Sequence, residues 1–206
     1  WYGIENESTM HNEGISNVLT TNSDLIIPKN YDFFDRWHSY LKEQGVDFVK
    51  IDTQGNTAEF LKGIKNCVKL CIDIQQAADK SVMKHFGGNV INCMGMSNLN
   101  SHSRPYTVLS RSSDDFFPDK ENSFESHIMQ NVYNAVFQSN LYFCDFDMWW
   151  TNHETAEISA ILRIISGGPV YISDKVGDTK AESIMPLLDE NGELKMCSDV
   201  ALPTED

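Results

Sequence analysis

Two segments of the chain end an apolar run in carboxylates, and their residues are the ones best suited to chemistry. They are residues 45–52, which read GVDFVKID, and residues 108–115, which read VLSRSSDD. An α/β scaffold places catalytic acids at the carboxyl ends of its strands, and each segment has this pattern. Two acids that face one pocket can break a glycosidic bond, because one attacks while the other transfers a proton. The sequence therefore predicts a site built on paired carboxylates.

The composition fits a globular protein with a neutral substrate. The chain has 206 residues, of which 41% are hydrophobic and 22% charged, and 30 acids against 16 bases give a net charge of -14. Such a surface repels phosphate backbones and anionic lipid, so we expect neither nucleic acid nor membrane as a partner. No apolar run approaches the roughly 20 residues of a membrane span. Sugars remain compatible with this charge.

The cysteines favour a reducing compartment. Their number is odd and they are scattered through apolar segments, which argues against a secreted disulfide framework and predicts a cytoplasmic protein. Cys67 and Cys71 are four residues apart and could share a metal ion, but no further Cys or His follows at ligand spacing. We interpret them as buried thiols and expect no metal and no cofactor.

The apolar spacing predicts alternating strands and helices. Residues 5–30 are polar without periodicity and predict a long surface loop. In helix 123–138, Ile128, Val132, Ala135 and Val136 are expected to face inward. The predicted helices are 31–44, which ends at Gly45, 57–85, 123–138 and 153–166, and the predicted strands are 46–52, 89–94, 106–111, 141–148 and 170–174.

This alternation implies an α/β fold with a parallel sheet covered by helices. A doubly wound sheet and a (β/α) barrel share the pattern. Acids recur at the ends of several predicted strands, as Asp52, Asp115, Asp147 and Asp174. Barrels gather function from many strand ends, whereas open sheets concentrate it at one switch point, so the acids favour the barrel. No glycine-rich nucleotide motif is present.

Four motifs together resemble glycoside hydrolase family 36. They are VKID at residues 49–52, RSSDD at 111–115, DFDM at 145–148 and ISGGPVYISDK at 165–175. The resemblance is to the branch that contains raffinose synthases, seed-imbibition proteins and alkaline α-galactosidases, and it covers nearly the whole chain. It implies a (β/α)8 TIM-barrel catalytic domain. By the family's order, the chain is expected to be one partial barrel domain, residues 1–206, with roughly strands 4 to 8. The first strands and any flanking β-domains would be absent.

The resemblance also implies roles for individual residues. The aspartate of the Lys-x-Asp strand end is the family's nucleophile, which here is Asp52. The acid/base stands four residues after the Arg of the second motif, which selects Asp115, with Asp114 as the alternative. The Lys and Arg of these motifs contact the sugar in the family, which maps to Lys50 and Arg111.

Elementary electrostatics agrees with these roles. Lys50 projects from the same strand face as Asp52, and a nearby ammonium lowers the pKa of a carboxyl, as a nucleophile requires. An acid/base needs a raised pKa instead. We expect burial beside Phe116 and Phe117, and the acidic neighbour, to raise the pKa of Asp115.

Further polar and aromatic residues have open roles. Asp145 and Asp147 alternate along a predicted strand, and we favour hydrogen bonding that supports the site over direct substrate contact. Trp149 either stacks on a sugar ring, as a substrate-binding residue, or packs the rim of the barrel. His127 and His153 are interpreted as surface or capping residues.

The resemblance implies a retaining α-galactosidase that cleaves terminal α-galactosyl bonds by double displacement through a covalent galactosyl-Asp52. Water as acceptor makes such an enzyme a hydrolase, whereas a sugar hydroxyl makes it a galactosyltransferase of the raffinose synthase type. A third possibility is an inactive or carbohydrate-binding fragment. The expected partners are oligosaccharide α-galactosides such as raffinose or melibiose, and the oligomeric state stays open.

Overall fold

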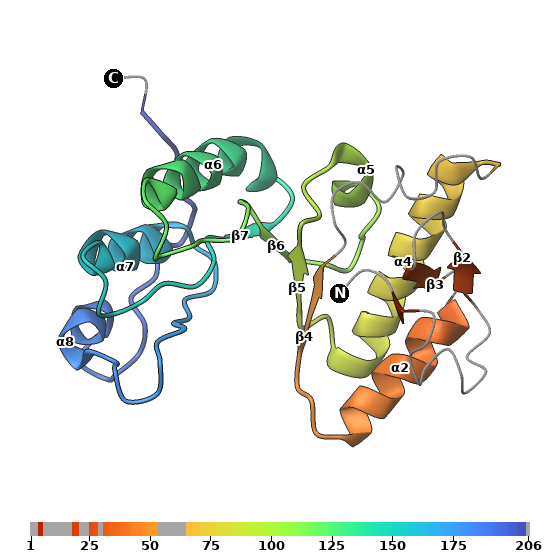
Figure 1. The fold of residues 1–206 in the computed structure, drawn as a ribbon, viewed down its shortest axis with the longest axis horizontal. Coiled ribbons are helices and arrows are strands. Elements are labelled where there is room, and N and C mark those ends of the chain that lie inside the picture. The colour runs from red at the N-terminus through yellow and green to blue at the C-terminus, as the bar shows by residue number, and fades with distance from the viewer. Residues whose placement is uncertain (1–3, 6–17, 21–24, 29–30, 53–64, 205–206) are drawn as a thin grey trace. The chain divides into compact units, whose positions relative to one another are not determined.

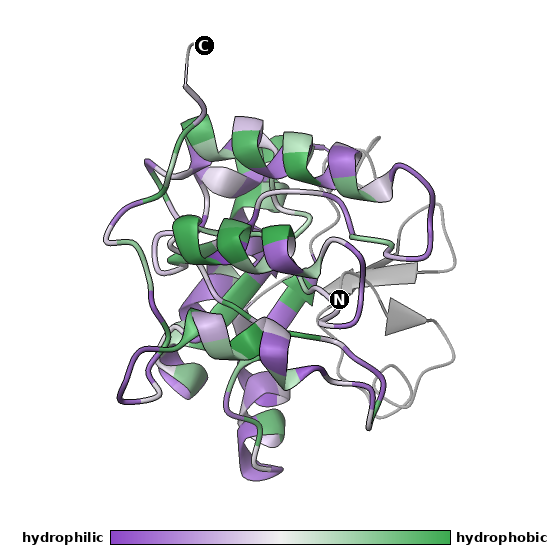
Figure 2. Ribbon diagram, turned by 90° about the vertical axis from the view of Figure 1, so that its left-hand side faces the viewer, coloured by the Kyte–Doolittle hydropathy of each residue, from purple (hydrophilic) through white to green (hydrophobic). Residues whose placement is uncertain are grey.

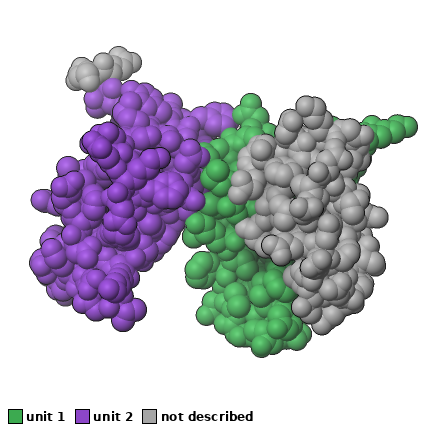
Figure 3. Space-filling model, viewed as in Figure 1, with its two compact units in different colours: residues 1–108 green, residues 109–206 purple. Residues whose placement is uncertain are grey.

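The computed structural model describes residues 4–5, 18–20, 25–28, 31–52 and 65–204, and Figure 1 labels their helices and strands. The chain divides into unit 1, Trp1–Val108, and unit 2, Leu109–Asp206, which Figure 3 draws in green and purple. Each unit contains one pair of parallel strands with helices between and after them.

Unit 1 is built around two long helices and a parallel strand pair. Strands β4 and β5 pair in parallel, with Val49 opposite Val90 and Asp52 opposite Cys93. Gly45 follows the first long helix with φ +84, which confirms it as the predicted C-terminal stop. The elements are α2 (Tyr31–Glu43), β4 (Val49–Asp52), α4 (Cys67–Phe86), β5 (Val90–Cys93) and the short α5 (Asn98–Ser101).

The core of unit 1 explains why these segments form. Helices α2 and α4 pack against each other (Figure 1), and buried Val82 and Phe86 of α4 contact Ile51 of β4 and Val90 of β5. The inward residue of β4 is therefore Ile51, the apolar residue between Lys50 and Asp52. Burial of this kind stabilises a helix more than its intrinsic propensity does. Residues 57–64 of the predicted helix 57–85 lie outside the described residues.

The expectation of a loop over residues 5–30 is wrong for its described parts. Strands β1 (Ile4–Glu5), β2 (Val18–Thr20) and β3 (Leu25–Pro28) form an antiparallel sheet in the order β1-β3-β2. The apolar residues 18–19 and 25–27 suit such strands, but their runs are too short to stand out in a polar sequence.

Unit 2 holds the second parallel pair, in which Arg111 of β6 stands opposite Asp145 of β7. Helix α6 has the bounds predicted for it. The predicted strand 170–174 is reduced to one parallel bridge between Trp149 and Ile172. The elements are β6 (Leu109–Arg111), α6 (Ser123–Gln138), β7 (Phe143–Asp145), α7 (Ala156–Ile165), α8 (Ala181–Ile184) and the 3-10 helix η1 (Met185–Leu187).

Helix α7 supplies much of the core of unit 2. Figure 2 shows it as mostly hydrophobic, whereas α6 alternates along its length. Ala156 and Ala160 on its buried side pack against Trp149 and Leu187. Small residues on this side let the indole approach the helix closely, which fills the space at the density of a protein interior.

Strands β4 and β5 pair in parallel within unit 1, β6 and β7 pair in parallel within unit 2, and helices follow these strands in the chain. The predicted α/β class with a parallel sheet is therefore confirmed. The closed (β/α)8 barrel and the numbering of these strands within it stay predictions. Among the described residues no helix has the length and apolar character that a membrane span requires.

Candidate active site

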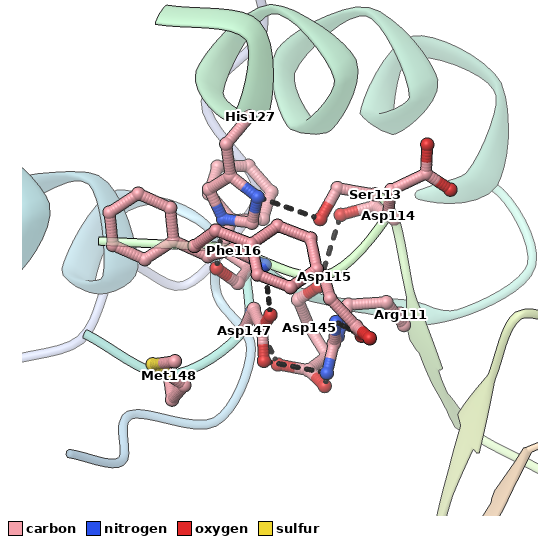
Figure 4. A network of polar contacts seen from close by, with 12 residues as sticks. Arg111, Ser113, Asp114, Asp115, Phe116, His127, Asp145, Asp147 and Met148 are labelled. Carbon is pink, nitrogen blue, oxygen red and sulfur yellow. Dashed lines mark hydrogen bonds and ion pairs between the residues drawn. The ribbon is translucent and has the colours of Figure 1, made fainter. Parts of the chain in front are cut away.

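Arg111, at the end of β6, is the centre of a cluster of acids (Figure 4). Its guanidinium is fully buried and contacts three carboxylates. Nη2 lies 2.6 Å from Oδ1 of Asp147, Nη1 lies 3.2 Å from Oδ1 of Asp115, and Nε lies 3.3 Å from Oδ2 of Asp145. One cation therefore joins the loop that follows β6 to the end of β7.

The three acids sit in different surroundings. Asp145 and Asp147 are buried, whereas the Asp115 side chain is 61% exposed. Burial raises the pKa of Asp145, and the nearby Arg111 opposes this rise. The cluster thus has two buried acids fixed against the cation and one acid that reaches solvent.

Tyr171 completes the buried side of the cluster. Its hydroxyl lies 3.0 Å from Oδ2 of Asp145 and 3.3 Å from Oδ1 of Asp147, so it can donate to either carboxylate. Burial, reinforced by the charge of Asp145, raises the pKa of Tyr171 and keeps the phenol protonated. A neutral donor between two anions reduces their mutual repulsion.

Asp147 links the two strand ends through its backbone as well as its side chain. It adopts a left-handed conformation, with φ +64, which aspartate tolerates better than most residues. Its N–H donates to Oδ1 of Asp145 at 2.8 Å, and its Oδ2 accepts the N–H of Phe116 at 2.9 Å. Asp147 therefore holds both Arg111 and the residue that follows Asp115. Both acids of the DFDM motif make the supporting hydrogen bonds that the sequence favoured for them.

His127 of α6 is a buried part of this region, so its interpretation as a surface or capping residue is wrong. Its ring stacks on Phe116 with centroids 4.9 Å apart (Figure 4). Nε2 lies 3.0 Å from the carbonyl oxygen of Phe146 and donates to it, which leaves Nδ1 to accept from the Ser113 hydroxyl at 3.2 Å. Burial lowers the pKa of His127, so the ring is neutral at neutral pH.

Arg163 of α7 holds the segment that follows β7, and the sequence analysis did not single it out. The buried guanidinium donates to the carbonyl oxygens of Phe146 and Met148 at 2.9 Å and of Asp147 at 3.2 Å. Burial lowers the pKa of Arg163 to about 10, which still leaves it charged at neutral pH. Arg163 is the one basic residue of a mostly hydrophobic helix, and this is the sequence signal that could have revealed it.

The predicted nucleophile stands at the carboxyl end of β4, in unit 1. Lys50 is exposed, Ile51 is buried and Asp52 is half-buried, so Lys50 and Asp52 leave the strand on the same side, as predicted. Asp115 belongs to unit 2. The pairing of Asp52 with Asp115 across one pocket stays a prediction.

The expected burial of Asp115 is not found. Phe116 packs on the His127 ring instead, and the Phe117 side chain is 56% exposed, so neither aromatic covers the Asp115 carboxylate. Asp114 is exposed as well, and its N–H donates to Oε1 of Gln130 at 2.8 Å.

Trp149 lies in the core, which corrects its assignment as a substrate-binding residue. Its side chain is 0% exposed and contacts Ala156, Ala160 and Leu187. A fully buried indole offers no face to a sugar ring, so packing is the role that the structure gives it. Cys71 is buried, as expected for a core thiol, and Cys67 is half-buried.

Comparisons with known proteins agree with the four motifs. The sequence model described as "Raffinose synthase or seed imbibition protein Sip1" matches residues 5–206. The probable galactinol–sucrose galactosyltransferase 6 of Arabidopsis thaliana is 34% identical over 206 residues, which cover 98% of this chain and 27% of the relative. The galactinol–sucrose galactosyltransferase of Pisum sativum is 30% identical, with 96% and 26% covered. The stachyose synthase of Pisum sativum is 28% identical, with 97% and 25% covered.

The chain thus spans about a quarter of the length of these relatives. The family match extends over almost all of its residues and includes the segments that carry Asp52, Arg111 and Asp115. The chain therefore belongs to the raffinose synthase branch of glycoside hydrolase family 36.

Proposed function

We propose that this chain carries the catalytic acids of an enzyme that transfers a galactosyl group from an α-galactoside to a hydroxyl group of a sugar. The observation that carries this choice is the naming of the relatives, which are galactinol–sucrose galactosyltransferases and a stachyose synthase. These names favour the transferase alternative over the hydrolase that the sequence analysis placed first.

In the first half-reaction, a carboxylate oxygen of Asp52 attacks the anomeric carbon of the bound galactoside. The bond from that carbon to the leaving oxygen breaks, and the carboxylic acid of Asp115 gives its proton to this oxygen. The product is a galactosyl ester of Asp52 and a free leaving group. A retaining enzyme of this kind holds its two carboxyl groups about 5–5.5 Å apart.

In the second half-reaction, Asp115 acts as a base. Its carboxylate takes the proton of an acceptor hydroxyl while the acceptor oxygen attacks the anomeric carbon, and Asp52 leaves as a carboxylate. Two displacements at one carbon retain its configuration. Water in the place of the acceptor gives hydrolysis, so the occupant of the acceptor side decides between the two reactions.

The exposed position of Asp115 supports its role in this scheme. The group has to give a proton to one molecule and take a proton from another, so its carboxylate must reach the ligands. Its Oδ1 is held by Nη1 of Arg111, and that guanidinium is itself fixed by Asp145 and Asp147. A carboxylate that is held by Arg111 and is still open to solvent suits a group that transfers protons in both directions.

Product analysis tests the proposal. The full natural polypeptide that carries these residues is incubated with galactinol, with and without sucrose, and free galactose and transfer products are measured. We expect transfer to exceed release of galactose when sucrose is saturating. Galactose as the dominant product would overturn the transferase in favour of the hydrolase.

Two further measurements test the residues. We expect a mechanism-based galactosyl inhibitor to label Asp52, and a folded protein without this label would contradict the assignment of the nucleophile. Asp115→Asn and Asp114→Asn are compared as a matched pair. We expect Asp115→Asn to lose more kcat than Asp114→Asn, because Asp115 is the acid of this pair that forms an ion pair with Arg111. The reverse order would move the acid/base role to Asp114.

A further inference from the structure

A hollow of about 200 Å³ opens beside Asp115. Its lining residues come from the segment between β6 and α6, within residues 114–122, and from the first two turns of α6, as far as Gln130. Pockets for drug-sized ligands measure about 300–1,000 Å³, so this hollow is of a size for a single sugar ring. All of its lining residues belong to unit 2 and none has a role in the chemistry above except Asp115.

One wall of the hollow is aromatic. Phe117 is the exposed aromatic residue among the lining residues, and the hydroxyl oxygen of Ser123 accepts its backbone N–H at 3.2 Å. The C–H-rich face of a sugar or cyclitol ring packs on such a surface. Nζ of Lys120 lies 6.0 Å from the centroid of the Phe117 ring and adds a donor at the rim.

The other walls are polar and carry both signs of charge. The lining residues include three acidic ones, Asp114, Asp115 and Glu121, and the basic Lys120. Donors and acceptors in this mixture suit a ligand with many hydroxyl groups, whereas the excess of negative charge disfavours a phosphorylated one. Gln130 is oriented, because its Oε1 accepts the Asp114 N–H.

One residue that lines the hollow, His127, has a fixed side chain. Its ring stacks on Phe116 and makes hydrogen bonds to the Phe146 carbonyl and Ser113. Groups fixed by such packing lose little further freedom when a ligand binds, which favours affinity.

We propose that this hollow is part of the acceptor subsite and binds one ring of the donor's leaving group and then one ring of a neutral, hydroxyl-rich acceptor sugar. The acid/base exchanges its proton with an oxygen of these groups, so they must lie within hydrogen-bond reach of Asp115. The Asp115 carboxylate contacts Arg111, and Asp115 is also one of the residues that line the hollow. The inference rests on the proposed function and adds the place and class of the acceptor.

The variant Phe117→Ala tests the subsite, with Phe137→Ala as its matched control. Phe137 is a similarly exposed phenylalanine, at 50% against 56%, and lies at the other end of α6, outside the hollow. Two quantities are measured on the full natural polypeptide: the dissociation constant of sucrose by calorimetry, and the KM for sucrose in the transfer reaction.

We expect Phe117→Ala to weaken sucrose binding and to raise this KM by roughly three- to tenfold, the contribution of one aromatic contact. Phe117→Tyr, which keeps the ring, should restore both values to within about twofold. Phe137→Ala should leave both unchanged.

Equal sucrose binding in Phe117→Ala and wild type, or no sucrose binding to folded wild type, would overturn the subsite. So would a rise in the donor KM with no change for sucrose, because it would place the galactosyl group of the donor in the hollow. Failure of the proposed function is separate, since it would show in wild type as galactose without transfer product. In that case the calorimetric comparison still decides whether the hollow binds sucrose.

Discussion

Replacement of Arg111 by methionine should destabilise the protein by about 3–5 kcal/mol at neutral pH, the cost of removing one partner from a buried ion pair. The three ion pairs of Arg111 contribute unequally to this loss of stability. Asp115 is mostly exposed, and an exposed pair contributes only about 0–1 kcal/mol. The main part of the loss therefore comes from Asp145 and Asp147, whose carboxylates would remain buried without their cation.

The loss should depend on pH in a definite direction. Burial already raises the pKa of Asp145 in the folded protein, and Arg111 opposes this rise, so its removal raises the pKa further. An acid whose pKa is higher in the folded state contributes stability at low pH and loses it as the pH rises through the folded pKa. The penalty of Arg111→Met should therefore be largest near neutral pH and shrink toward about pH 4.

Urea unfolding at the two pH values measures this effect, with Arg163→Met as the control. Arg163 is equally buried, and its hydrogen bonds go to carbonyl oxygens, which do not titrate. The charges of Asp147 and Asp145 also act on it, so the penalty of Arg163→Met should fall with the pH, but less than that of Arg111→Met. An Arg111→Met penalty that is below about 1 kcal/mol, or that is the same at both pH values, would refute the electrostatic reasoning.

Three further predictions concern the same unit. Trp149→Ala should lower the free energy of unfolding by about 3–5 kcal/mol, as measured by urea unfolding, because it empties a core position. Trp149→Phe should fold and keep the KM for sucrose, and a raised KM would speak for a sugar contact instead. Tyr171→Phe should cost about 1.5–3 kcal/mol in the same assay, since two buried carboxylates lose a donor, and an unchanged midpoint would contradict this. Gly168→Ala should cost about 1–3 kcal/mol or more, because the new methyl group would overlap the carbonyl oxygen of Cys144, and a fully stable variant would show that the backbone adjusts.

Helix α6 shows both the strength and the limit of the sequence analysis. Its bounds, Ser123–Gln138, were predicted correctly, because a long periodic segment between polar turns is the clearest local signal. Its inward face was predicted only in part: Ala135 is buried and Val132 packs beside it, but Val136 is exposed. The other buried residues of the helix are the polar His127, Asn131 and Gln138. Hydropathy assigns polar residues to solvent and cannot anticipate a buried face made of hydrogen bonds.

The acid cluster marks the same limit for the site. The resemblance to the family's motif selected Arg111 and the acid four residues later, and the structure brings these two together. Nothing in the sequence indicated that Asp145 and Asp147 contact the Arg111 guanidinium, because such contacts depend on which strands are neighbours in the sheet. Strand β7 ends at Asp145 and Asp147 adopts a left-handed conformation, so the predicted strand 141–148 does not describe the backbone at Asp147.

The pairing of Arg111 with Asp145 has a consequence for folding fidelity. These residues stand opposite each other in the register of β6 and β7. A slip of one residue would bring Cys144 or Phe146 to that position and turn the acid to the other face of the sheet. The guanidinium would then be buried without a neighbouring carboxylate from β7, at a cost of several kcal/mol. The cluster therefore selects one alignment of two strands that are only three residues long, which backbone hydrogen bonds alone could not distinguish from its neighbours.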